Sequence, residues 1–159
     1  MRFGLLIAAA ALGLVGCNEP EVTAELTVLN LPNMIAGIPS DEIPHCAITR
    51  IVDGDTITMV CDGFDGNVRL TGFDTPETYE PGCASERALG ERAKRYLEQL
   101  LIEAEFIIPE FQGQGRYGRP LVGLTLDGVP LEQTMVAAGL AAPYSGQTRP
   151  DWCAVLANR

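Results

Sequence analysis

Three short runs near the middle of the chain alternate apolar and polar residues, and this pattern constrains the fold more than any other feature. The runs are CAITRIVD (46–53), TITMVC (56–61) and NVRLTGF (67–73). Alternation with a period of two places the apolar side chains on one face of a β-strand. The turn sequences DGD and GFDG separate the runs. The region therefore predicts a three-stranded antiparallel meander.

The residues that follow predict helices and two further strands. The stretch at 85–104 has apolar residues at helical spacing, with Ser85 as a candidate N-cap. EFIIPEF (105–111) and RPLVGLTLDG (119–128) are predicted strands, and Pro109 predicts an edge or a bulge for the first. A short helix at 129–139 ends the pattern. The fold class is α+β, mainly β: a five-stranded barrel with two to three packed helices, or alternatively a split α+β sandwich.

The N-terminal residues have the features of an export signal. Residues 1–16 hold one basic residue followed by an apolar run that is too short for a membrane-spanning helix. The last four residues before the tether, Leu14-Val15-Gly16-Cys17, resemble a bacterial lipobox, in which Cys17 is lipidated. We expect an exported protein that is lipid-anchored in the cell envelope, periplasm-facing or at the outer membrane. An ordinary secretory signal cut nearby is the alternative. Residues 17–45 are a predicted tether, and residues 46–159 form the predicted domain.

The four other cysteines predict disulfides. An even number of cysteines in an exported protein is typical of disulfide bonding. Three pairings are possible. Cys46 and Cys61 flank the first predicted hairpin, which favours a Cys46–Cys61 bridge and leaves Cys83–Cys153. A metal site of four thiolates is the alternative, but the sequence has no C-x-x-C spacing.

The charge balance excludes one class of nucleic-acid-binding protein. The chain has 21 acidic and 11 basic residues, a formal net charge of −10. A domain this acidic does not hold long nucleic acid mainly by releasing counterions. A small cluster of arginines can still bind one phosphate, because guanidinium groups donate two parallel hydrogen bonds to phosphate oxygens.

Four acids lie at the ends of the strand-like runs, and they raise the question of what binds among them. Turn chemistry explains Asp53 better than it explains Asp55 and Asp74. Carboxylates on two separate loops suit a hard cation such as Ca²⁺ or Mg²⁺. His45, the only histidine, precedes the first strand. Proton transfer would therefore fall to a carboxylate, for which Glu77 is the candidate.

The motifs VDGDT, VRLTGFDTPE, RYGRPL and GVPLEQTMVAAGLA occur in this order and together resemble the staphylococcal nuclease (thermonuclease) family. The resemblance runs from about Cys46 to about Tyr144. It implies an OB-fold barrel with packed helices. It also implies a Ca²⁺-dependent phosphodiesterase that acts on DNA or RNA as a monomer and leaves 3′-phosphates.

The resemblance also implies roles for individual residues. Asp55 and Asp74 match carboxylate ligands of Ca²⁺, and Thr75 matches a ligand that uses its backbone carbonyl. Glu77 matches the residue that activates water. The residues matched to phosphate and nucleotide binding are Arg69, Arg119, Arg116 and Tyr117.

Two other functions remain as alternatives. One is a catalytically inactive OB-fold module that binds nucleic acid in the envelope, and the other is a structural envelope lipoprotein. The complete set of acids and arginines favours the enzyme. The long C-terminal helix of secreted family members is expected to be absent or reduced, with the Cys83–Cys153 bridge replacing its stapling role.

Overall fold

A computed structural model describes residues 29–30 and 46–158 of the chain. The predicted signal peptide at 1–16 and the predicted lipidation site Cys17 lie outside the described residues. Of the predicted tether, only Leu29–Asn30 (β1) is described, and it pairs antiparallel with β2.

The first half of the sheet is the predicted meander. The strands β2 (Cys46–Asp53), β3 (Thr56–Cys61) and β4 (Phe64–Leu70) pair antiparallel in sequence order. One detail differs from the prediction, because the run at 67–73 is not one strand. It breaks at Thr71, and β5 (Gly72–Asp74) belongs to a separate two-stranded sheet with β9 (Ala142–Tyr144). Gly72 has a φ of +91°, which turns the chain away from the first sheet.

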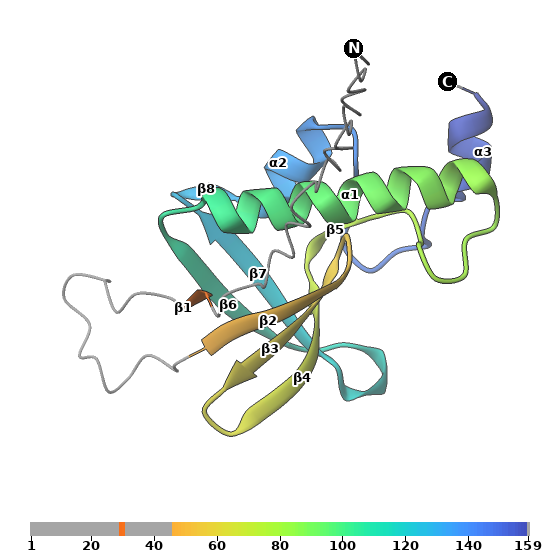
Figure 1. Cartoon of the computed structure of the whole chain (residues 1–159). Coiled ribbons are helices and arrows are strands. Elements are labelled where there is room, and N and C mark those ends of the chain that lie inside the picture. Colours follow the sequence, from red (N-terminus) through yellow and green to blue (C-terminus); the bar gives the residue numbers. More distant parts are fainter. Residues whose placement is uncertain (1–28, 31–45, 159) are drawn as a thin grey trace, which may run out of the picture.

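The second half joins the first through a parallel pair. Strand β7 (Pro120–Leu126) pairs parallel with β4 and antiparallel with both β6 (Ile107–Gln114) and β8 (Val129–Pro130). Among the described strands β6 has β7 as its one partner, so the edge position predicted from Pro109 is confirmed. The order is β1-β2-β3-β4-β7-β6, and no described ladder joins β6 back to β1 or β2. The sheet is therefore open and does not close into a five-stranded barrel (Figure 1).

Three α-helices accompany the sheet within residues 46–158. They are α1 (Ala84–Glu103), α2 (Leu131–Ala137) and α3 (Trp152–Ala157). A single 3₁₀ turn, η1 (Arg116–Gly118), lies between β6 and β7. The predicted cap is wrong by two residues, because Cys83 is the N-cap of α1 and its carbonyl accepts from the Arg87 N–H at 3.2 Å. Figure 1 shows α1 crossing the sheet with α3 beside its N-terminal end. Strands and helices together confirm the α+β class.

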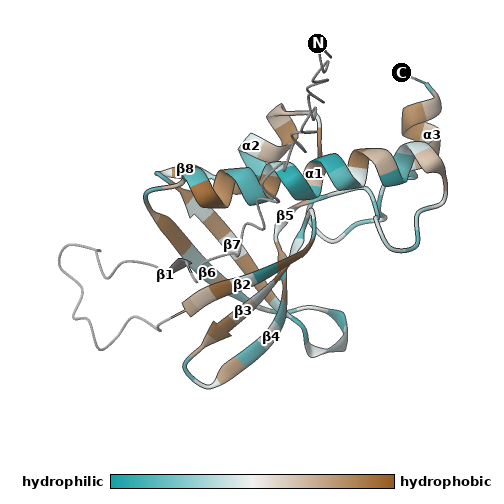
Figure 2. Cartoon of the chain, viewed as in Figure 1, coloured by the Kyte–Doolittle hydropathy of each residue, from teal (hydrophilic) through white to brown (hydrophobic). Residues whose placement is uncertain are grey.

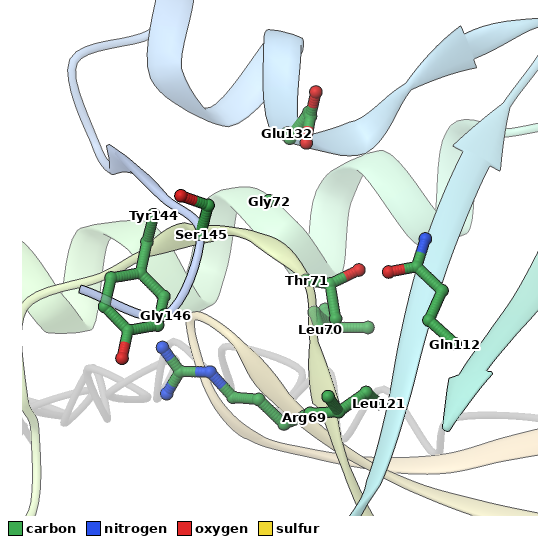
Figure 3. A pocket seen from close by; sticks show the side chains of 10 residues that line it. All are labelled: Arg69, Leu70, Thr71, Gly72, Gln112, Leu121, Glu132, Tyr144, Ser145 and Gly146. Atoms are coloured by element: carbon green, nitrogen blue, oxygen red, sulfur yellow. The ribbon is translucent and has the colours of Figure 1, made fainter. Parts of the chain in front are cut away.

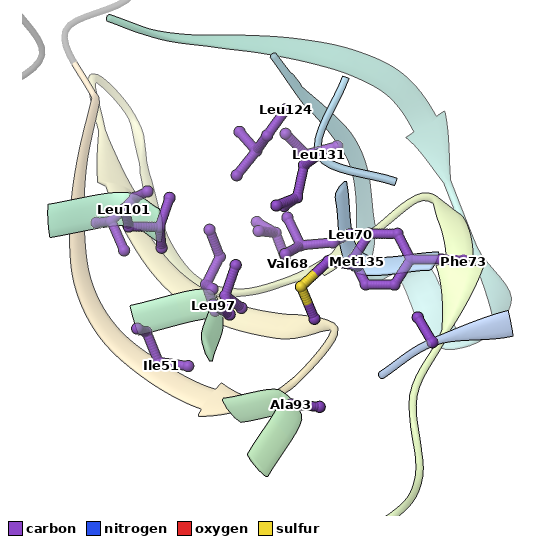
Figure 4. Packing of buried hydrophobic residues seen from close by; sticks show 14 of the residues in the cluster. Ile51, Val68, Leu70, Phe73, Ala93, Leu97, Leu101, Leu124, Leu131 and Met135 are labelled. Carbon is purple, nitrogen blue, oxygen red and sulfur yellow. The ribbon is translucent and has the colours of Figure 1, made fainter. Parts of the chain in front are cut away.

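The core lies between α1 and the sheet. Hydrophobic and hydrophilic residues alternate along α1 (Figure 2), and its buried apolar residues recur at helical spacing. Figure 4 shows Leu97 of α1 beside Val68, with Leu101 farther along the helix and Met135 of α2 close to Leu70. No helix in the described part of the chain is long and apolar enough to cross a membrane.

Two disulfides join elements at opposite ends of the domain. Cys46–Cys61 links paired residues of β2 and β3, with Cα atoms 4.1 Å apart. Cys83–Cys153 links the start of α1 to α3 across 70 residues of sequence. Both are the pairings favoured by the sequence. Glu86 lies close to the second bridge, but its two sulfurs are bonded to each other, so this group is not a thiolate metal site.

Candidate active site

Two buried acids converge on one arginine. Arg69, near the end of β4, places its Nη1 atom 2.7 Å from Oδ1 of Asp55 and its Nη2 atom 2.8 Å from Oδ1 of Asp74. Asp74 is only 1% exposed, and the other two side chains are also buried. The two acids lie on different loops, so the sequence motifs VDGDT and VRLTGFDTPE meet at a single guanidinium.

Strand register and two glycines produce this convergence. The Leu70 N–H donates to the Asp55 carbonyl at 2.8 Å, which holds the β2–β3 turn against the end of β4. A Cβ atom at Gly54 would lie 2.9 Å from Oγ1 of Thr75, so only glycine allows the two acid-bearing loops to approach this closely. The turn at Gly72 then redirects the chain, so that Asp74 returns toward Arg69.

The carboxylate of Asp55 has further donors. The Thr75 N–H donates to its Oδ2 atom at 3.1 Å, and the Thr56 hydroxyl donates to its Oδ1 atom at 3.1 Å. Burial raises the pKa of Asp55, against the opposing charge of Arg69. The Thr75 hydroxyl oxygen is buried without a hydrogen-bond partner. Thr75 thus contacts Asp55 through its backbone N–H while its hydroxyl stays unsatisfied.

Glu77 is held as an ionised carboxylate. Its Oε1 atom accepts the N–H groups of Thr78 at 3.0 Å and Tyr79 at 3.1 Å. Burial alone would raise the pKa of Glu77, but these hydrogen bonds, one shared with Asp53, and the charge of Arg149 bring it below its ordinary value. Burial, the hydrogen bond to Glu77 and the charge of Asp55 raise the pKa of Asp53 to about 6. As the pH falls, Asp53 therefore takes up a proton before Glu77 does.

The loop that carries Glu77 is fixed to α1 by Glu86. This side chain accepts the Gly82 N–H at 2.7 Å and the Glu77 N–H at 3.3 Å. At Gly90 a Cβ atom would lie 2.7 Å from the Pro76 carbonyl oxygen, so the loop rests directly on the helix. The sequence analysis did not identify Glu86. Its position three residues after the N-cap Cys83, where glutamate commonly binds N–H groups, was the available signal.

Acids and arginines line the same cleft, which has a volume of about 540 Å³. Asp53, Asp55 and Glu77 border this cleft together with Arg69, Arg119 and Arg149. Burial and then the neighbouring charges of Arg69 and Arg149 lower the pKa of Arg119. Guanidinium groups that crowd in this way create a site that favours an anion.

The two residues predicted to contact the nucleotide lie farther out. Arg116 and Tyr117 line a second cleft of about 620 Å³, which shares Arg69, Arg119 and Arg149 with the first. Tyr117 is 94% exposed and has a φ of 68°, an uncommon conformation for a residue other than glycine. These two side chains therefore form an outer rim and do not contact the acids.

A third hollow, of about 430 Å³, lies along Arg69 (Figure 3). Figure 3 shows the Arg69 side chain extending toward Tyr144, with Glu132 of α2 and Gln112 of β6 on the other walls. Tyr144 was given no role by the sequence, and it borders both this hollow and the second cleft.

The sequence analysis also missed two partners of Asp74. The Nε atom of Arg149 lies 3.3 Å from Oδ1 of Asp74, and Nε1 of Trp152 lies 3.0 Å from Oδ2. Both residues precede Cys153, whose bridge to Cys83 brings this segment to the start of α1. The favoured disulfide pairing was the signal that could have placed them near the acids.

The acid residues fit a hard divalent cation. Asp55, Asp74 and Glu77 offer only oxygen donors, as Ca²⁺ and Mg²⁺ prefer. The Oδ2 atoms of Asp55 and Asp74 each accept one hydrogen bond, which leaves a lone pair on each. Thr75, whose N–H donates to Oδ2 of Asp55, also has a buried hydroxyl oxygen without a hydrogen-bond partner. The donors are of the type that such a cation prefers, and the oxygens of Asp55, Asp74 and Glu77 do not all lie within 4.8 Å of one another in this structure.

Comparisons with known proteins agree with this geometry. A family model described as Staphylococcal nuclease homologue matches residues 67–153. Thermonuclease of Staphylococcus hyicus is 29% identical over 130 residues, which cover 76% of this chain and 75% of that protein. Endonuclease YncB of Bacillus subtilis (strain 168) is 30% identical over 112 residues, or 67% of this chain and 53% of that protein. Thermonuclease of Staphylococcus intermedius is 32% identical over 97 residues, or 59% of this chain and 56% of that protein. This chain thus spans only slightly more than half the length of the last two relatives.

Proposed function

This chain belongs to the staphylococcal nuclease family of phosphodiester-hydrolysing nucleases, and we propose that it is a Ca²⁺-dependent member, exported and lipid-anchored. Its substrate is DNA, RNA or both, cleaved to 3′-phosphate products. The observation that carries the proposal is the convergence of Asp55 and Asp74 on Arg69, because Arg69 and Asp55 line a cleft together with Glu77 and Arg119.

The arginines bind the phosphodiester. Arg69 donates one N–H to each acid, so its remaining N–H groups are available for phosphate oxygens. Arg119 and Arg149 also line this cleft and add further donors. Donors aimed at the charge that develops in the transition state are each worth about 10²–10³ in rate in comparable enzymes. Local arginines thereby bind the substrate although the chain as a whole is acidic.

Glu77 acts as the general base. Its low pKa keeps it ionised at neutral pH, and the two backbone donors orient its carboxylate. An ionised carboxylate can orient a water molecule and accept its proton. Among the residues that line this cleft there is no histidine to compete for that role.

Asp55, Asp74 and the backbone carbonyl of Thr75 would hold the cation. When bound, Ca²⁺ supplies positive charge that offsets the negative charge developing on the phosphate. Hydrogen bonds from Thr56 and Thr75 hold the Asp55 carboxylate in place for this task.

Nuclease assays test the function. We expect the wild type to release acid-soluble nucleotides from DNA or RNA with Ca²⁺ and to stop in EGTA, and Glu77→Gln to lose at least about 10²-fold in rate. Glu110→Gln makes the same chemical change at an exposed position on β6, outside the clefts, and should keep full activity. If the wild type released no nucleotides with Ca²⁺, the alternative of an inactive nucleic-acid-binding module would be favoured.

Detergent partitioning tests the anchor. We expect the wild type, expressed from its full sequence in a bacterial host, to enter the detergent phase of Triton X-114, whereas Cys17→Ser stays in the aqueous phase. A single acyl-modified cysteine holds an otherwise soluble domain at a membrane surface. Equal partitioning of the two proteins would favour an ordinary secretory signal.

A further inference from the structure

The carboxylate of Asp74 has a partner that lies outside the motifs of the nuclease resemblance. The indole N–H of Trp152 donates to its Oδ2 atom at 3.0 Å, across 78 residues of sequence. Both side chains are buried, with Trp152 5% exposed and Asp74 1% exposed. A charged oxygen this deeply buried is strongly dependent on its hydrogen-bond donors.

The two oxygens of Asp74 face different partners. Oδ1 lies toward the guanidinium groups, 2.8 Å from Nη2 of Arg69 and 3.3 Å from Nε of Arg149. Oδ2 receives the indole N–H. Because the donors approach from two sides, they fix the rotation of the carboxylate about its Cβ–Cγ bond. The arginines are charged donors, whereas the indole N–H is a neutral donor on a flat, rigid ring that also restrains this rotation.

A disulfide fixes the position of the indole. Cys153 directly follows Trp152 and is bonded to Cys83, the N-cap of α1. The same first turn of α1 carries Glu86, which binds the backbone of the Glu77 loop. The start of α1 therefore positions both a proposed cation ligand and the proposed general base.

We propose that Trp152 is a positioning residue that orients Asp74 toward the divalent cation, and that the Cys83–Cys153 bridge keeps it in place. This inference rests on the proposed Ca²⁺ dependence of the enzyme. Partners that hydrogen-bond to a metal ligand typically change metal affinity by about 10–100-fold when they are removed. A purely structural role for Trp152 would lower stability without lowering the affinity of the folded protein for Ca²⁺.

Calorimetric titration with Ca²⁺ alone tests the proposal. We expect Trp152→Phe, which keeps an aromatic ring but loses the N–H, to raise the Kd for Ca²⁺ by about tenfold or more. Leu156→Ala is the matched control, because it removes packing of α3 against the core without touching the hydrogen bond. This control should lose stability and keep its Ca²⁺ affinity. Circular dichroism below the melting temperature establishes that each variant is folded.

Two further measurements apply even if Trp152→Phe is poorly folded. Trp152 is the only tryptophan. Its fluorescence emission in the unaltered protein should therefore change during a Ca²⁺ titration, with the same midpoint as the calorimetric titration. In Cys83→Ala/Cys153→Ala, which keeps the indole, the Kd for Ca²⁺ should also rise. Excess Ca²⁺ should restore most of the kcat of each variant.

The outcomes separate this inference from the proposed function. If the wild type binds Ca²⁺ and folded Trp152→Phe binds it equally well, the positioning role is wrong and the nuclease proposal stands. Trp152 fluorescence that does not change when Ca²⁺ is added would also contradict the positioning role. If the wild type itself binds no Ca²⁺, the proposed calcium dependence fails and the inference fails with it.

Discussion

The two loops that border the candidate site are built in opposite ways. The acid loop (residues 74–82) is held by other parts of the domain, through Glu86 of α1, the close contact at Gly90 and the indole of Trp152. The arginine loop (residues 115–119) is closed by two backbone hydrogen bonds between its own residues, Gly115 N–H to the Arg119 carbonyl and Gly118 N–H to the Gly115 carbonyl. Asp74 is buried, whereas Arg116 and Tyr117 are exposed.

This difference matches the chemistry proposed for each loop. Carboxylates that bind a cation must lie at fixed positions, and positions fixed before binding reduce the reorganisation needed during the reaction. Exposed guanidinium and aromatic groups can follow a nucleic acid whose bases and backbone vary. Substitutions in the acid loop should therefore change stability and catalysis together, and those at the exposed Arg116 and Tyr117 of the arginine loop should change substrate binding alone.

The largest effect is expected for Asp74→Asn. The substitution removes a buried charge that pairs with Arg69 and Arg149, so the free energy of unfolding should fall by about 3–5 kcal/mol. Activity with Ca²⁺ should fall at least about 10²-fold. Urea denaturation and nuclease kinetics measure the two effects. Asp62→Asn, in an exposed turn, is the control. Full activity of Asp74→Asn would contradict the role of this loop.

Reducing the Cys83–Cys153 bridge should rank second. A bridge that closes 70 residues restricts the unfolded chain, and its loss should lower the free energy of unfolding by about 2–4 kcal/mol. Cys83→Ala/Cys153→Ala is compared with Cys46→Ala/Cys61→Ala by thermal denaturation. The second pair closes only 15 residues, and its loss should lower stability less and leave activity unchanged. An unchanged melting curve for Cys83→Ala/Cys153→Ala would show that this bridge does not stabilise the folded domain.

A smaller loss is expected for Glu86→Gln. The amide has one accepting oxygen where Glu86 offers two, so either the Gly82 or the Glu77 N–H loses its partner. We expect about 1–3 kcal/mol less stability and a lower kcat, because the Glu77 loop is less well fixed. Chemical denaturation and steady-state kinetics test this. Unchanged kcat despite reduced stability would separate the fixing of the loop from catalysis.

The smallest effects should follow substitution of the two exposed side chains of the arginine loop. Arg116→Ala and Tyr117→Ala remove exposed side chains at the outer rim of the second cleft. We expect KM for an oligonucleotide to rise several-fold, with kcat, Ca²⁺ affinity and melting temperature unchanged. Ser145→Ala, exposed in the adjacent hollow, serves as a control. A fall in kcat of the size expected for Asp74→Asn would remove the distinction between the two loops.

Local sequence patterns predicted most of the elements, because alternation and helical spacing depend on neighbouring residues. The meander β2–β4, helix α1 and the edge position of β6 follow directly from them. The break between β4 and β5 does not, because the positive φ of Gly72 is required by the path of the chain in space. The open sheet likewise depends on how far the strands extend and pair, which alternation alone does not specify.

The candidate site was predictable to the extent that its residues lie in contiguous motifs. Asp55, Arg69 and Asp74 come together as expected, and Arg119 borders the same cleft. Arg149 and Trp152 reach Asp74 because a disulfide and a short helix fold the C-terminal segment back onto α1. Such contacts depend on the assembled tertiary structure and leave no periodic pattern in the sequence. Glu86 was not predicted, because the predicted N-cap was Ser85 and nothing in the sequence links Glu86 to Glu77.

The contact between Asp74 and Trp152 has a consequence for the order of events during protein synthesis. The indole lies 78 residues downstream of the carboxylate that it contacts, so a growing polypeptide carries every acid of the cleft long before this donor is translated. A nascent chain therefore lacks the donor that we propose orients Asp74, and its affinity for Ca²⁺ should stay below that of the finished protein until translation has passed Trp152 and the Cys83–Cys153 bond has formed.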